Sequence, residues 1–117
     1  MAYTYEQIRE IFLKLPEDLR EAYFSENISD KIIDIGKKHK LNVDETGILG
    51  GETGLVLLGE EHPNKFIANL SAKLGVDKTA AREIAQDINE QVFRPVRDSL
   101  RKIHGITDGS EISAKVS

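Results

Sequence analysis

The glycines between positions 47 and 54 are the first residues in this sequence whose type and spacing could support chemistry. Glycine-rich loops bind phosphate groups because their backbone N–H groups converge on an anion at the start of a helix. A Walker A loop also needs Lys and then Ser or Thr directly after its last glycine, but here Leu55 and Val56 follow Gly54. A dinucleotide-binding fingerprint needs a preceding strand, which the sequence does not predict. We therefore expect these glycines to serve packing.

Glycines four positions apart lie on one face of a helix, where they let another backbone approach closely. Gly47 and Gly51 have this spacing, and so do Gly50 and Gly54. The approaching backbone could belong to the same chain or to a second copy. The predicted packing or interface residues are Gly47, Gly50, Gly51, Gly54, Leu55 and Leu58.

Glu60, Glu61 and His62 form a short cluster that could bind a divalent ion, but no further ligand follows at a suitable spacing. His39 and His104 lie in cationic helix ends, where positive charge is favourable. The sequence has no cysteine and no nucleophile-elbow motif. We predict no metal, no cofactor and no enzymatic activity. A small metal-dependent hydrolase around the Glu-Glu-His cluster is the least favoured hypothesis.

The segment 66–90 resembles a helix-turn-helix, with a small residue at Ser71, Gly75 four positions later and an apolar residue after it. In such a motif the second helix enters the major groove, and here Lys78, Thr79, Arg82 and Gln86 would face the DNA. Two observations oppose this interpretation. The predicted second helix is long, and Glu83 and Asp87 share its surface. Two helices joined by a Gly stop and an Asp cap are the favoured alternative.

Arg94, Arg97 and Arg101 have spacings of three and four, so they share one helix face. This basic stripe could bind phosphates or an acidic partner. A solvated last helix whose cations suit its dipole is the favoured interpretation.

Composition limits the remaining possibilities. The chain has 117 residues, 39% of them hydrophobic and 31% charged, and a net charge of −4. This length suits one domain, and the acidic balance disfavours a dedicated nucleic-acid binder. No apolar run approaches the roughly 20 residues that a membrane-spanning helix needs. Because no secretory signal is visible at the N-terminus, we expect a cytoplasmic protein.

Helical periodicity and capping residues define the expected elements. Capping boxes at Thr4 and Asn42 predict two helix starts, because Gln7 and Glu45 stand three residues later. The expected helices cover 4–14, 17–24, a third that starts near Ser25 or Asn27 and ends at 37–40, 43–58, 62–74, and 77–104 with a bend at Pro95. Each glycine in 46–54 costs a helix about 0.5–1 kcal/mol, so helix propensity is weakest there.

Three strings carry a resemblance: residues 15–22, residues 56–59 followed by His62 and Pro63, and residues 84–89 leading to 93–95. Together they resemble a group of small, uncharacterised helical proteins from candidate-phylum bacteria. The resemblance covers residues 10–104 and implies an all-helical fold in a bacterial cytoplasm. Because that group has no assigned activity, the resemblance assigns no functional residue.

The sequence therefore predicts one all-α domain over residues 1–105, a compact bundle of five to six helices, and a disordered tail over 106–117. The favoured function is a non-catalytic protein–protein interaction module or a small homo-oligomer. The alternative is a nucleic-acid-binding domain that uses the helix-turn-helix-like segment 66–90 or the basic stripe.

Overall fold

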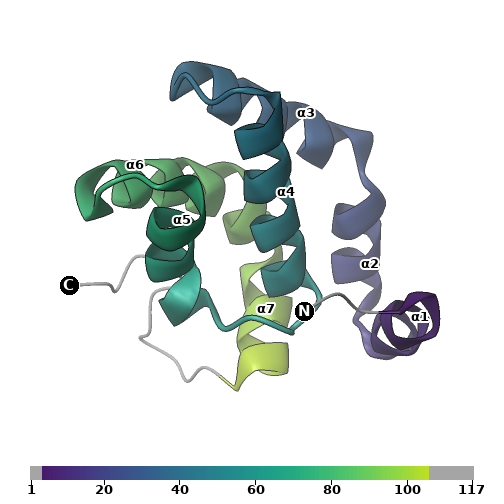
Figure 1. Ribbon diagram of the computed structural model, residues 1–117. Helices are drawn as coiled ribbons and strands as arrows, with labels where there is room; N and C mark the ends of the chain where they lie inside the picture. Colours follow the sequence, from purple (N-terminus) through teal and green to yellow (C-terminus); the bar gives the residue numbers. More distant parts are fainter. Residues whose placement is uncertain (1–3, 106–117) are drawn as a thin grey trace.

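The computed structural model describes residues 4–105, and all the regular elements in that range are helices (Figure 1). The first half contains α1 (Tyr5–Lys14), α2 (Glu17–Phe24), α3 (Glu26–Lys38) and α4 (Val43–Leu57). The second half contains the 3-10 turn η1 (Pro63–Lys65), α5 (Phe66–Leu74), α6 (Lys78–Ile88), the π-helical turn η2 (Asn89–Phe93), the 3-10 turn η3 (Arg94–Val96) and α7 (Arg97–His104). The predicted all-α fold is confirmed. The predicted tail, 106–117, lies outside the described residues.

Capping residues set the helix boundaries. Thr4 and Asn42 both form the predicted capping boxes, in which each side chain accepts from the backbone N–H three residues on. Ser25 and Asp77 also accept from the N–H of the third residue after them. Gly59, Gly75 and Gly105 follow α4, α5 and α7 with positive φ, the backbone conformation that ends a helix at low cost for glycine.

The last predicted helix leaves regular α-helical geometry at Asn89, earlier than expected, and the irregular stretch includes the predicted bend at Pro95. From α6 to α7 the chain is helical without interruption, but it passes through η2 and η3 around Pro95. Proline has no N–H to donate to the carbonyl four residues earlier, so the Gln91 carbonyl loses that partner. Lys31 of α3 supplies a replacement, since its Nζ donates to the Gln91 carbonyl at 3.3 Å. The bend is thus stabilised from a neighbouring helix.

Helix α4 lies in the centre of the molecule, with α2 and α3 on one side and α5 on the other (Figure 1). Its core face carries Leu49, Thr53 and Val56, each fully buried. Burying a large apolar side chain contributes about 1.5–3 kcal/mol. This burial and the capping box at Asn42 offset the cost of the four glycines, so α4 is a continuous helix.

The core extends from α4 through both halves of the chain. Phe66 and Phe93 meet edge to face with ring centroids 5.4 Å apart, and Leu19 and Leu100 are fully buried. Helix α1 is different, because none of its residues is fully buried in the described structure. None of the described helices is both long and apolar enough to cross a lipid bilayer.

Candidate functional site

An apolar groove of about 800 Å³ lies between α4 and the helices α2 and α3, and α1 borders one end of it. Most of its lining comes from glycines and aliphatic residues of α3 and α4. The lining consists of Ile8, Tyr23, Ile28, Ser29, Ile32, Ile33, Lys37, Leu41, Asn42, Val43, Thr46, Gly47, Gly50, Gly51, Thr53, Gly54, Leu55, Leu57 and Leu58. Its volume falls within the range of about 300–1,000 Å³ that is typical of ligand sites.

The four glycines of α4 form one wall of this groove. They stand at i, i+3, i+4 and i+7, which places them on a single helix face, opposite the core face that carries Leu49 and Val56. A side chain at Gly47 or Gly51 would meet no described atom within 4 Å of its Cβ. The α4 backbone is therefore bare at Gly47 and Gly51, about one turn apart, on the face that does not build the core.

No second backbone of the described chain packs against these glycines. The nearest atoms to a Cβ at Gly50 and Gly54 belong to side chains, Ile32 at 3.9 Å and Tyr23 at 3.1 Å. Of the two alternatives, close approach by a backbone of the same chain is not observed at Gly47 and Gly51, whereas Gly54 packs against the Tyr23 ring. Approach by another molecule stays a prediction.

The two leucines of the predicted set have different surroundings. Leu55 is half-buried and lines the groove. Leu58 also contacts the groove but is only 3% exposed, so it belongs chiefly to the core. A smaller cavity of about 570 Å³ lies beneath α1 and shares Leu58 with the groove.

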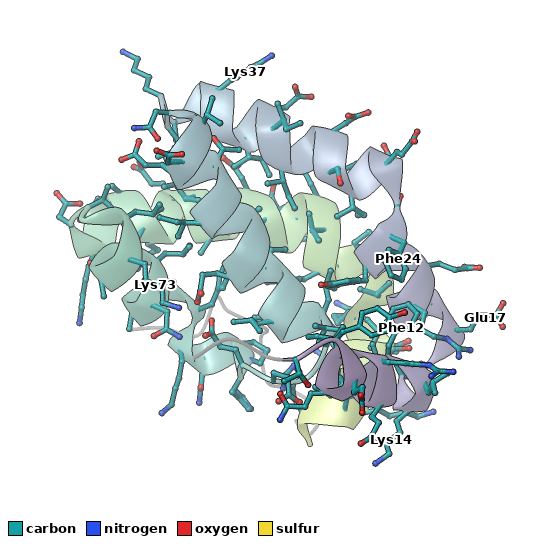
Figure 2. All side chains as sticks on the ribbon, turned by 45° about the vertical axis from the view of Figure 1, so that its right-hand side comes forward. Phe12, Lys14, Glu17, Phe24, Lys37 and Lys73 are labelled. Atoms are coloured by element: carbon teal, nitrogen blue, oxygen red, sulfur yellow. The ribbon has the colours of Figure 1, made fainter. Side chains whose placement is uncertain are left out.

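The two ends of the groove differ in chemistry. Lys37 is the one charged side chain among the described residues that line it, and Figure 2 shows Lys37 at the opposite end of the α2–α3 pair from Phe12 and Phe24. At the other end, Phe12 packs on Phe24 with ring centroids 4.7 Å apart and on Tyr23 at 6.0 Å. Phe24 nevertheless remains 70% exposed. The groove is apolar with Lys37 at one end, and Tyr23, the aromatic residue in its lining, connects it to the Phe12–Phe24 pair, which lies outside the lining.

The predicted Glu60–Glu61–His62 cluster does not converge. Glu61 hydrogen-bonds to Glu52 and Asn69, whereas the His62 Nδ1 accepts from the Asn64 N–H at 3.1 Å. No group of three or more His, Cys, Asp or Glu residues in the range 4–105 is arranged to bind a metal.

The helix-turn-helix-like segment has the predicted order of elements, with α5, a turn at Gly75 and then α6. Lys78, Thr79, Arg82 and Gln86 are all exposed on α6. The expected long second helix is wrong in one respect, because regular α-helix ends at Ile88, where η2 begins.

The Asp87 side chain lies toward α3, away from the exposed row of α6 that consists of Lys78, Thr79, Arg82 and Gln86. It accepts from Lys38 at 3.0 Å and lies 2.7 Å from the His39 Nε2. Burial by itself would raise the pKa of Asp87, but the hydrogen bonds from His39 and Lys38 outweigh it and hold the pKa below 3.8. Asp87 therefore stays ionised and joins the C-terminal end of α3 to α6.

The basic stripe is split between two environments. Arg94 and Arg97 are exposed, but Arg101 is half-buried. Nearby, the Ser99 hydroxyl donates to the Asp18 carboxylate at 2.8 Å and so connects α7 to α2. The first two arginines are thus the accessible part of the predicted stripe.

Sequence reasoning missed the buried carboxylate of Glu52, whose residue is 4% exposed. Its position carried a signal, because Glu52 stands three residues after Leu49 and four before Val56 and so falls on the core face of α4. The residues of α4 that the sequence analysis selected are instead the neighbouring glycines, which lie on the opposite face of the helix.

Comparison of the chain with protein-family models, curated proteins and solved structures finds no match.

Proposed function

We propose that this protein is a non-catalytic interaction module whose groove binds an amphipathic helix of a partner protein. The observation that carries the proposal is the bare α4 backbone, which forms one wall of an apolar groove of about 800 Å³. An amphipathic helix laid into an apolar groove is a common mode of peptide recognition.

The shape of the glycine face favours a helix over a compact ligand. Residues 47–54 span seven helical steps, or about 10 Å at about 1.5 Å per residue. Where the strip is open, at Gly47 and Gly51, a second helix can approach closely and form Cα–H···O contacts with the α4 backbone. Ile28 and Ile32 of α3 provide the facing apolar wall.

Charge defines the orientation of the partner. Because Lys37 is the charged residue at the groove, we expect an acidic side chain on the partner helix at that end. The partner helix should carry small residues where it crosses Gly47 and Gly51, with larger apolar residues beside them.

The test uses a phage-displayed library of amphipathic helical peptides selected on the full chain. Gly51→Leu fills the groove and should weaken the selected peptides about tenfold, or about 1.4 kcal/mol. Ala68→Leu is the matched control, because it adds the same side chain at an exposed position of α5 and should leave affinity unchanged. Peptides that bind the Gly51→Leu protein as tightly as the wild type would contradict the proposal.

Sedimentation of the wild type and both variants tests whether a second copy of this chain occupies the groove. If the wild-type chain forms a dimer that Gly51→Leu abolishes and Ala68→Leu preserves, the groove belongs to a second copy and not to a different partner. A monomer in all three cases, together with peptide binding, supports the partner helix.

The exposed row of α6 supports a second candidate function, nucleic-acid binding. The observation that favours it is the placement of Asp87, which pairs with Lys38 and His39 and leaves Lys78 and Arg82 exposed. Binding to duplex DNA should then weaken steeply with salt. Arg82→Glu should abolish it, and the double change Arg94→Glu and Arg97→Glu tests the stripe separately. Binding that survives all three substitutions would exclude both faces.

A further inference from the structure

A cluster of charged side chains lies on the opposite side of α4 from the groove. The Glu52 side chain is 5% exposed, and its Oε2 accepts from the Lys73 Nζ of α5 at 2.5 Å. Figure 2 shows Lys73 across α4 from Phe12 and Phe24. Glu61, in the turn after α4, hydrogen-bonds to Glu52 and to Asn69 of α5. Three elements therefore meet at one buried carboxylate.

Glu52 and Glu61 can hydrogen-bond to each other only through a shared proton. Glu52 Oε1 and Glu61 Oε2 are buried, and neither oxygen receives a hydrogen bond from a donor group of the described residues. An ionised carboxylate only accepts hydrogen bonds, so these two side chains can bond to each other only if one is protonated. One shared proton and the Lys73 ammonium make the cluster neutral. Loss of that proton leaves one negative charge without compensation.

The surroundings of Glu61 strengthen the binding of this proton. Burial is the largest of the effects that together raise the pKa of Glu61 to about 7, and the hydrogen bond and charge of Glu52 act in the same direction. Asn69 and Lys73 act in the opposite direction. The hydrogen bond to Glu52 raises the pKa of Lys73, so the ammonium persists throughout this range. These are the groups from α4 and α5 that face Glu61.

We propose that the Glu52–Glu61 pair is a proton-operated latch, which holds the segment Gly59–Pro63 against α5 while one proton is shared and releases the segment when the proton leaves. The segment closes the C-terminal end of α4, since the Glu60 and Glu61 N–H groups both donate to the Leu55 carbonyl. Release therefore loosens the end of α4, where Leu55 of the last turn and the C-cap residue Leu58 line the groove. The latch does not depend on the proposed function, because it concerns the chain by itself.

The direct test is ¹³C NMR of the glutamate side-chain carboxyls in the wild-type chain. One carboxyl of the Glu52–Glu61 pair should titrate with a midpoint near 7, while exposed glutamates titrate near their usual value of about 4.3. Titration of every glutamate below about pH 5 would overturn the proposal. This measurement needs no variant.

Amide hydrogen exchange tests the release itself. Protection of Gly59, Glu60 and Glu61, corrected for intrinsic exchange, should fall as the pH rises through the titration. Glu61→Gln keeps a neutral donor at the same place and should remove this pH dependence, whereas Glu83→Gln, an exposed change on α6, should keep it. Protection that is independent of pH in the wild type, or equally dependent in Glu61→Gln, would refute the latch.

Discussion

At the scale of single residues, the glycines of α3 and α4 have opposite surroundings. Gly36 of α3 is buried, and a Cβ there would lie 2.6 Å from the Thr46 hydroxyl and 3.0 Å from its methyl group. Gly51 of α4 has open space where a Cβ would be. Gly36 is therefore needed for the α3–α4 packing, while nothing inside the described chain requires glycine at position 51.

This contrast predicts stability changes of opposite sign. Gly36→Ala should destabilise the chain by about 1–3 kcal/mol, because overpacking displaces Thr46 and its helix. Gly51→Ala should stabilise it by about 0.5–1 kcal/mol, because alanine favours a helix interior. Urea unfolding followed by circular dichroism measures both changes. A loss of stability in Gly51→Ala would show that its surroundings are more crowded than the structure indicates.

At the scale of elements, side-chain caps define where α4 and α6 begin. The Asp77 Oδ1 accepts from the Ala80 N–H at 2.7 Å, which satisfies one of the unpaired donors at the start of α6. Its negative charge also suits the positive end of the helix dipole. This cap fixes the turn between α5 and α6, and so the direction in which Lys78 and Arg82 leave the molecule.

Asp77→Ala should therefore cost about 1 kcal/mol of folding free energy, since it removes the acceptor of the cap. Asp77→Asn is the matched control, because the amide oxygen keeps that acceptor and should restore most of the stability. Thermal or urea unfolding distinguishes the two. Equal losses in both variants would mean that the charge, and not the hydrogen bond, carries the effect.

At the scale of the whole molecule, the C-terminal ends of α4 and α7 meet through His104. Its Nε2 lies 2.9 Å from the Val56 carbonyl of α4, and its ring stacks edge-on against His62 with centroids 5.3 Å apart. Burial lowers the pKa of His104 below 6.5 and the His62 charge lowers it further, although the hydrogen bond to Val56 opposes both. The folded state thus favours neutral His104.

A depressed histidine pKa makes stability depend on pH in a definite direction. The contribution of His104 is complete above its unfolded pKa of about 6.5 and is lost as the pH falls through the folded pKa, because the unfolded chain then binds the proton more tightly. Relative to His104→Gln, the wild type should therefore lose stability as the pH falls from 7 to 5. Urea midpoints at several pH values give this difference. A stability difference between the wild type and His104→Gln that does not change with pH would contradict this prediction.

Glu61 contributes the opposite slope. Its folded pKa of about 7 lies above the ordinary glutamate pKa of 4.5, so its stabilisation is complete below about pH 4.5 and is lost as the pH rises toward 7. The wild-type pH profile is the sum of both effects. Comparison with Glu61→Gln and His104→Gln separates them.

Most helix boundaries could be predicted because they depend on neighbouring residues. The capping boxes at Thr4 and Asn42, the stop at Gly59 and the bend at Pro95 each involve groups within four or five positions along the chain. Such features follow from backbone geometry and hydrogen bonding, which the local sequence contains.

Local sequence patterns were enough to predict an all-helical chain with its caps, its stops and a glycine face on one helix. What that face meets depends on how α2 and α3 pack beside α4, where Ile32 and Tyr23 lie against Gly50 and Gly54 and a groove stays open beside Gly47 and Gly51. The tertiary structure also brings Glu61 to Glu52 and Lys73. The physical reason is that caps and periodicity depend on residues a few positions apart, whereas a groove and a buried charge cluster depend on how separate helices pack.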